Sequence, residues 1–289
     1  MNYPFSYFNF ITHLALLFLW CRIWTDDDRN YFFNPFVTGP MRVVDRVLGV
    51  LRIPFPFLPN RVLAAIALIT ALAVKGVVTH YIFFSQTAPF SFFKISRMEI
   101  WYFLVSALLI AGLNALLRLI SPRRMDRAGQ VADLFARPIG WIRPVALQLP
   151  TVFIVIFIFV VFDHLRFRSS FIDQQFAPMP IDYGALFFST LFSKSALLFA
   201  IVYFLGILHV WSQLTLLAIL ASWLGLIMPR SPIAVYGREF CSLLLGRFSG
   251  LLVVGMMDLT PLIFFLVIGW LHDALAKLVG HLLMGYPFP

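Results

Sequence analysis

Six long apolar stretches alternate with more polar segments along this chain of 289 residues. They cover residues 5–24, 62–84, 99–120, 149–167, 195–227 and 259–278. Crossing about 30 Å of hydrocarbon takes roughly 20 helical residues, and lipid cannot satisfy the backbone groups of an open strand. The pattern therefore predicts an all-α, polytopic membrane protein of about six transmembrane helices. The fifth stretch is long for a single span, so we expect it to tilt, to break near Gly206 or to begin outside the membrane.

Three of the connections show polar residues every three or four positions, as on one side of a helix. This polar side carries Arg42, Asp45, Arg46, Gly49 and Arg52 in the first connection, Asp126, Arg127, Gln130, Asp133 and Arg137 in the second, and Arg238, Glu239, Ser242 and Gly246 in the third. We expect three amphipathic helices that lie in the headgroup plane and bind lipid phosphates through arginines. The arginines expected to do so are Arg42, Arg46, Arg52, Arg127, Arg137, Arg143, Arg238 and Arg247. Short helices packed on the protein itself are the alternative.

The composition supports a lipid environment and the charges suggest an orientation. Hydrophobic residues make up 61% of the chain and charged residues 12%, which leaves too little polar surface to coat a water-soluble globule. Most arginines flank the first, third and fifth connections, so we expect these to be cytoplasmic and both termini periplasmic, in a bacterial inner membrane. The net charge of +9 then favours anionic lipid headgroups, and not nucleic acid, as the counter-ions.

The chain repeats itself at several levels. Residues 4–8 read Pro-Phe-Ser-Tyr-Phe and residues 89–93 read Pro-Phe-Ser-Phe-Phe, each just before an apolar stretch. Together with the recurring basic amphipathic segment, this indicates three related two-span units, residues 1–88, 89–180 and 181–289.

Two short runs resemble a known family. Residues 134–144, Leu-Phe-Ala-Arg-Pro-Ile-Gly-Trp-Ile-Arg-Pro, resemble the interfacial Leu-Leu-Arg-Pro-Ile-Arg run of the YggT family of small membrane proteins. Residues 258–263, Asp-Leu-Thr-Pro-Leu-Ile, are similar to the Asp-Leu-Ser-Pro run that opens the return helix of that family. No copy holds both runs intact, and the first copy is degenerate. The resemblance implies accessory or assembly work in a membrane, because relatives are linked to the assembly of electron-transfer complexes, to division machinery and to osmotic tolerance. It carries over no catalytic residue.

The second run also has a physical interpretation of its own. A proline in the first turn of a helix loses no hydrogen bond, and a preceding acid can cap the exposed amides. Asp258 before Thr260 and Pro261 therefore predicts a capped helix start, with a proton-carrying acid as the alternative.

Polar residues inside the apolar stretches are the candidate functional residues, because they are costly in lipid. Lys75 is expected either to extend to the outer headgroups or to face a partner or pore, and Asn114, Ser212 and Gln213 to form hydrogen bonds between helices. His13 and His209 are the deepest histidines and thus candidate ligands of a haem or pigment, although no cofactor is required. No metal site is expected.

The sequence contains no phosphate-binding loop, His-Glu-x-x-His, Gly-x-Ser-x-Gly or Cys-x-x-Cys motif, so we do not expect an enzyme. The leading hypothesis is a non-catalytic accessory, scaffold or assembly subunit of a larger inner-membrane complex, of the electron-transfer or photosynthetic kind. Its expected partners are membrane lipids and other integral membrane subunits. A transporter or channel for ions or small solutes is the alternative, since internal repeats are typical of transporters.

Overall fold

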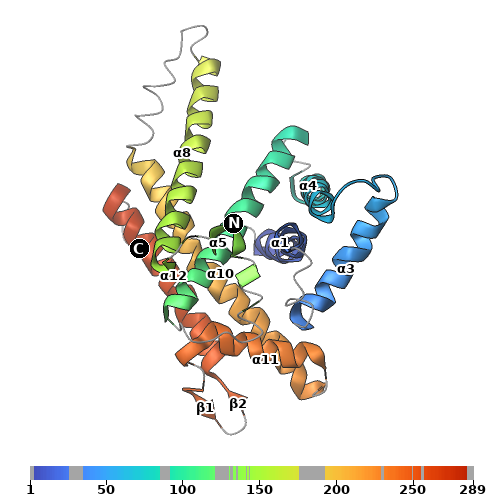
Figure 1. The fold of residues 1–289 in the computed structure, drawn as a ribbon. Helices are drawn as coiled ribbons and strands as arrows, with labels where there is room; N and C mark the ends of the chain where they lie inside the picture. Colours follow the sequence, from blue (N-terminus) through green and yellow to red (C-terminus); the bar gives the residue numbers. More distant parts are fainter. Residues whose placement is uncertain are drawn as a thin grey trace. The chain divides into compact units, whose positions relative to one another are not determined.

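The structure is a computed structural model that describes residues 3–25, 35–84, 92–120, 130, 133–134, 136–140, 142, 144–175, 193–228, 231–248, 250–254 and 257–284. Over these residues the chain is helical apart from turns and two strands of two residues each (Figure 1). It divides into two compact units. Unit 1 contains Met1–Ala111 and Arg124–Trp141, and unit 2 contains Gly112–Arg123 and Ile142–Pro289.

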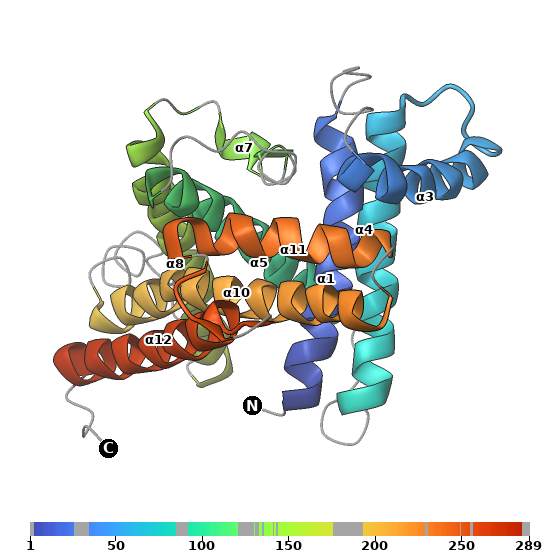
Figure 2. The same cartoon turned by 90° about the horizontal axis from the view of Figure 1, so that it is seen from below.

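Unit 1 is built from α1 (Tyr3–Trp24), α3 (Pro35–Arg52), α4 (Asn60–Thr79), the π-helical turn η1 (His80–Phe84), most of α5 (Phe92–Ile120) and the short α7 (Arg137–Gly140). Helix α3 lies across one end of α1 and α4, as the two views in Figures 1 and 2 agree. Two clusters of buried side chains hold these helices together. One comprises Leu17, Leu68, Leu72, Phe103 and Ala107, and the other comprises Val44, Leu48, Leu63, Ala64 and Ala67.

Unit 2 contains the end of α5, the 3-10 turn η2 (Val145–Leu147), α8 (Gln148–Gln175), α10 (Lys194–Ile227), α11 (Pro232–Leu245), the 3-10 turn η3 (Gly246–Phe248) and α12 (Thr260–Met284). Strands β1 (Val253–Val254) and β2 (Met257–Asp258) form an antiparallel ladder before α12. Helices α8, α11 and α12 all pack on α10, the longest of the described helices.

Five of the described helices are long and apolar enough to cross a membrane. Their apolar spans are Asn60–Ile82, Ile95–Ile120, Val145–Asp163, Lys194–Leu224 and Thr260–Leu283. They match the second to sixth stretches predicted from the sequence, which confirms the all-helical class with several helices able to span a membrane. Helix α1 covers the first predicted stretch, with a shorter apolar segment, Ala15–Trp24, among the residues searched.

Helix α10 runs without interruption over 34 residues, which excludes the alternative of a break near Gly206; at about 1.5 Å per residue it is about 51 Å long. Other helices extend beyond the predicted stretches, α8 to Gln175 and α12 to Met284. Helix α5 begins at Phe92, seven residues before the predicted start at Glu99, because a helix can continue through polar residues outside the hydrocarbon. Glu99 is therefore two turns inside the helix.

The predicted cap of the last helix is confirmed. The Asp258 carboxylate accepts a hydrogen bond from the Thr260 backbone N–H at 2.9 Å, and the Thr260 hydroxyl oxygen accepts one from the backbone N–H of Leu252 at 2.9 Å. These bonds fix the point at which the β-ladder gives way to α12.

Candidate functional site

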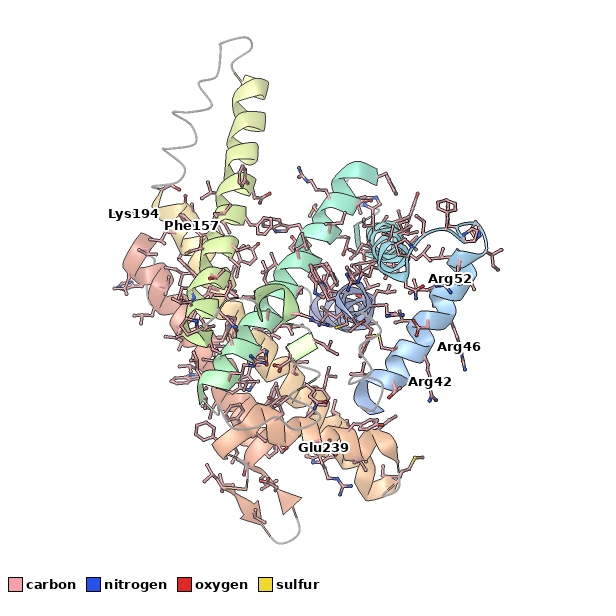
Figure 3. All side chains as sticks on the ribbon, in the orientation of Figure 1. Arg42, Arg46, Arg52, Phe157, Lys194 and Glu239 are labelled. Carbon is pink, nitrogen blue, oxygen red and sulfur yellow. The ribbon has the colours of Figure 1, made fainter. Side chains whose placement is uncertain are left out.

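The arginines of α3 lie on the exposed side of that helix. Residues Val37, Met41, Val44 and Leu48 form its buried face, while Arg42, Arg46 and Arg52 are exposed along its length (Figure 3). Val43, Val47 and Val50 are exposed as well, with 60%, 48% and 67% of their surface accessible. At 100° per residue Val47 lies beside the buried face, and Val43 and Val50 lie between it and Arg46 in a valine ridge.

The third predicted amphipathic segment forms α11, which packs on the protein itself, the alternative given for these segments. Gly237 lies so close to α10 that an added Cβ would come within 2.4 Å of the Ser222 nitrogen. The Trp211 indole Nε1 on α10 donates a hydrogen bond to the Leu244 carbonyl at 2.9 Å. Helix α11 therefore runs alongside α10, and Arg238 is exposed on its outer side.

Of the remaining arginines predicted to bind lipid, the structure describes only the side chain of Arg137. The half-buried Arg137 donates from Nη1 to the Trp24 carbonyl at 2.8 Å, so it satisfies the end of α1 as well as facing solvent. Arg127 and Arg143, and the side chain of Arg247, lie outside the described part of the structure.

A buried ion pair joins two spans of unit 1. The Lys75 ammonium on α4 donates to Glu99 Oε2 on α5, and only 7% of either side chain is exposed. Lys75 therefore points into the helix bundle and does not extend to the outer headgroups. Sequence reasoning missed Glu99, although opposite charges on consecutive antiparallel spans were a signal that could have revealed it.

A glycine allows the two helices to approach closely enough for this pair. A Cβ added to Gly76, next to Lys75, would lie 2.8 Å from Ile95 Cγ2 and 3.0 Å from Glu99 Cγ, both on α5. A Cβ at 2.8 Å would force Ile95 to shift, so the bare backbone of α4 at Gly76 packs against side chains of α5.

His13 on α1 completes the cluster from a third helix. Its Nε2 lies 3.6 Å from Glu99 Oε2, and its Nδ1 lies 3.3 Å from the Ser106 hydroxyl oxygen. Because Ser106 donates its own proton to the Tyr102 carbonyl at 2.8 Å, His13 Nδ1 is the donor to Ser106 and carries the hydrogen. His13 Nε2 faces the Glu99 carboxylate, with which the ring forms an ion pair when it is protonated.

Lys75 and Glu99 lie inside the apolar spans of α4 and α5, one to two turns from the end at which these helices are joined. Lys75 is seven residues from the end of its span at Ile82, about 10 Å, and Glu99 is four residues from the start of its span at Ile95, about 6 Å. A haem or pigment metal at His13 Nε2 would have to displace the Glu99 contact, so the environment of this histidine suits an ion-pair cluster better than a cofactor ligand.

Unit 2 contains a second group of polar side chains within its spans. The rings of His209 on α10 and His272 on α12 lie 5.5 Å apart, and Gln213 Nε2 is 3.3 Å from His209 Nε2. His272 Nδ1 lies 2.9 Å from Asp273 Oδ1 and can donate to it. No group of three or more potential metal-ligating side chains occurs among the described residues.

The predicted hydrogen bonds between spans are found only in part. The Ser212 hydroxyl on α10 donates to the Phe265 carbonyl on α12 at 3.4 Å, as expected for a bond between helices. Gln213 instead contacts His209 one turn away on its own helix, and Asn114 is buried on α5.

The outer face of α12 is unusually exposed for a span. Only 6% of its apolar window is buried in the molecule, compared with 28% to 50% for the other four spans. Trp270 is 72% exposed there, and the Asp273 side chain is 74% exposed. Asp273 is 13 residues from Thr260 and ten from Leu283, or about 20 Å and 15 Å along the helix, which places it near the middle of the span.

Comparison with protein-family models, curated proteins and solved structures finds no match for the chain.

Proposed function

We propose that this chain is a non-catalytic accessory or assembly subunit of a larger inner-membrane complex and that α12 contacts a protein neighbour. The observation that carries the proposal is the exposure of Asp273 and Trp270 near the middle of a membrane span. Lipid acyl chains are poor surroundings for both side chains, whereas a protein surface can supply hydrogen bonds and packing.

The energetic argument is strongest for the acid. An Asp at the centre of a lipid-exposed helix costs about 2.5–3.5 kcal/mol even on the lenient insertion scales, so such residues almost always face protein or a water-filled cavity. The hydrogen bond from His272 offsets only part of this cost, because 74% of the Asp273 side chain remains exposed. Tryptophan is normally enriched at the membrane interfaces and not at mid-span, which points the same way for Trp270.

Helix α3 supports the membrane location of the proposed subunit. It lies across the ends of α1 and α4, its valine ridge can dip towards acyl chains, and its arginines can bind phosphates of anionic headgroups. We assign α1 as the sixth span and place α3 on the cytoplasmic surface on the charge argument. The resemblance of residues 134–144 and 258–263 to the YggT family fits the same accessory role.

The proposal is tested by photo-crosslinking in native membranes. A photoreactive residue replacing Leu266, which is 59% exposed on the same face of α12, should yield adducts with an integral membrane protein. The matched control replaces Ile158, which is 46% exposed on α8 where its neighbours are apolar, and should yield lipid adducts. Lipid adducts alone at both positions would contradict the proposal.

Transport is the second candidate function, and the buried Lys75–Glu99–His13 cluster is the observation that favours it. Ionisable side chains buried between spans often mark ion or proton pathways. This function predicts proton or cation flux in reconstituted vesicles that is lost in Glu99→Gln and retained in Glu239→Gln, a change on α11. Equal flux in the two variants, or flux no greater than in protein-free vesicles, would exclude it.

A further inference from the structure

We infer that the buried Lys75–Glu99–His13 cluster binds water, and that this water enters from one side of the membrane only, past the hydroxyls of Thr79 and Ser96. The side is the one on which α4 and α5 are joined to each other, which is the periplasmic side in the orientation expected from the charges. The inference goes beyond the proposed function, because it requires neither a protein neighbour on α12 nor transport.

Two buried hydroxyls near the cluster lack hydrogen bonds. Thr79 is 4% exposed, and neither its Oγ1 nor the Oγ of Ser96 has a hydrogen-bond partner within the described part of the chain, although both oxygens are buried. Buried hydroxyls are nearly always bonded to protein or to ordered water, because an unpaired hydroxyl has lost its hydration without replacement. Water is therefore the partner expected for both side chains.

Both hydroxyls lie between the cluster and the joined ends of the two helices. Thr79 is one turn beyond Lys75 on α4, and Ser96 is about one turn before Glu99 on α5, so the two hydroxyls extend the cluster in the same direction. Thr79 is three residues from the end of its span, about 4.5 Å, and Ser96 is one residue from the start of its own. Water at this level is therefore close to the aqueous phase.

The Glu99 carboxylate has an oxygen available for this water. Lys75 and His13 both approach Oε2, so Oε1 accepts from neither of them. A buried water typically has about three polar partners, and Glu99 Oε1 together with the two hydroxyls supplies three. A bound cation fits less well than water, because Lys75 already balances Glu99 and an added cation would leave an uncompensated charge within the span.

The opposite side of the cluster is closed by apolar side chains. Each of the three helices contributes to one buried apolar cluster, three or four residues further from the joined ends. The members are Leu17 on α1, Leu72 on α4 and Phe103 on α5, each at most 2% exposed. The Phe103 ring also packs edge-on against His13, with 5.8 Å between the ring centroids. Closely packed apolar side chains exclude water, so the path ends at the ion pair.

The decisive experiment measures how fast Ag⁺ reacts with single cysteines in membrane vesicles. Ag⁺ is a small soft ion that binds thiolates, and a thiolate forms only where water reaches the sulfur. Thr79→Cys and Ser96→Cys are conservative in size and are introduced one at a time into a full-length chain without Cys21 and Cys241. The Ag⁺ is added in chloride-free buffer to one side of the membrane, and the thiols that remain are counted after unfolding.

Two further positions are the matched controls. Val78→Cys lies next to Thr79 but on the outer surface of α4, where Val78 is 40% exposed, and Leu72→Cys lies beyond the ion pair. With Ag⁺ on the side of the joined ends, Thr79→Cys and Ser96→Cys should react at least about tenfold faster than either control, and with Ag⁺ on the other side they should not. Thr79→Cys as slow as Val78→Cys, or Leu72→Cys as fast as Thr79→Cys, would overturn the inference.

Removal of one hydroxyl gives a second measurement. Thr79→Val keeps the shape of the side chain; if Oγ1 binds water, the melting temperature in detergent should be equal or lower, whereas loss of a dry buried hydroxyl would raise it and contradict the inference. The control is Thr215→Val, because the Thr215 hydroxyl already donates to the Trp211 carbonyl at 2.8 Å, and it should not raise the melting temperature. Neither measurement detects ion flux or a neighbour of α12, so the inference and the proposed function can fail separately.

Discussion

The Lys75–Glu99 pair makes a quantitative prediction about stability. We consider Lys75→Met, Glu99→Gln and the double variant Lys75→Met/Glu99→Gln, measured as changes in the free energy of unfolding. Each side chain of the pair is 7% exposed, so removal of one partner leaves the other buried among apolar helices. Breaking a buried pair in this way costs about 3–5 kcal/mol.

The two single variants should not be equal. In Lys75→Met the buried Glu99 carboxylate loses the ammonium and keeps only the contact with His13 Nε2, 3.6 Å away, so a cost of about 3–5 kcal/mol is expected. In Glu99→Gln the ammonium of Lys75 is about 10 Å from the end of its span and can extend towards the headgroups. We expect a smaller loss there, about 1–3 kcal/mol.

The double variant removes both charges and should lose at least about 2 kcal/mol less than the sum of the single losses. Unfolding in mixed micelles by added denaturing detergent, followed by helical circular dichroism, measures all three variants. Glu239→Gln, a half-buried position on α11, is the control for the Glu-to-Gln change and should shift the unfolding free energy by less than about 0.5 kcal/mol. A Lys75→Met variant as stable as this control, or strictly additive losses, would refute the buried-pair argument.

Two further variants probe the packing and the thiol chemistry. Gly76→Ala places a methyl group against α5 and should destabilise unit 1 by about 1–3 kcal/mol, whereas Gly49→Ala on the open side of α3 should not; equal unfolding free energies would contradict the close approach. Burial raises the pKa of the Cys241 thiol to about 11, so about one thiol in a thousand is ionised at pH 8. Alkylation of Cys241 in a Cys21→Ala background should therefore be slow and rise about tenfold per pH unit up to that pKa, and a rate typical of a free thiol at pH 8 would contradict the burial.

The spans themselves could be predicted from the sequence, because the need to fill the hydrocarbon with apolar side chains leaves a continuous local signal. The helix at residues 99–120 was predicted with its end correct and its start late, since the polar residues Lys94, Ser96 and Arg97 do not stop a helix. The cap at Asp258 was likewise local, and it is confirmed.

What could not be predicted depends on contacts between distant segments. Glu99 looked like the edge of a span, and only the approach of α4 at Gly76 shows it to be the partner of Lys75. Helix α11 has the amphipathic pattern of an interfacial helix, yet the close approach of Gly237 to the α10 backbone and the hydrogen bond from Trp211 hold it along α10. The three-unit division at residues 88 and 180 remains a prediction.

The central claim is that the middle of α12 is covered by protein within the bilayer, and spin-label accessibility at position 270 tests it most directly. In proteoliposomes, a label on Trp270→Cys should show low accessibility both to oxygen, which concentrates in lipid, and to a water-soluble nickel reagent, while a label on Ile158→Cys should be highly accessible to oxygen. Equal oxygen accessibility at the two positions would show that Trp270 faces lipid and would contradict the account.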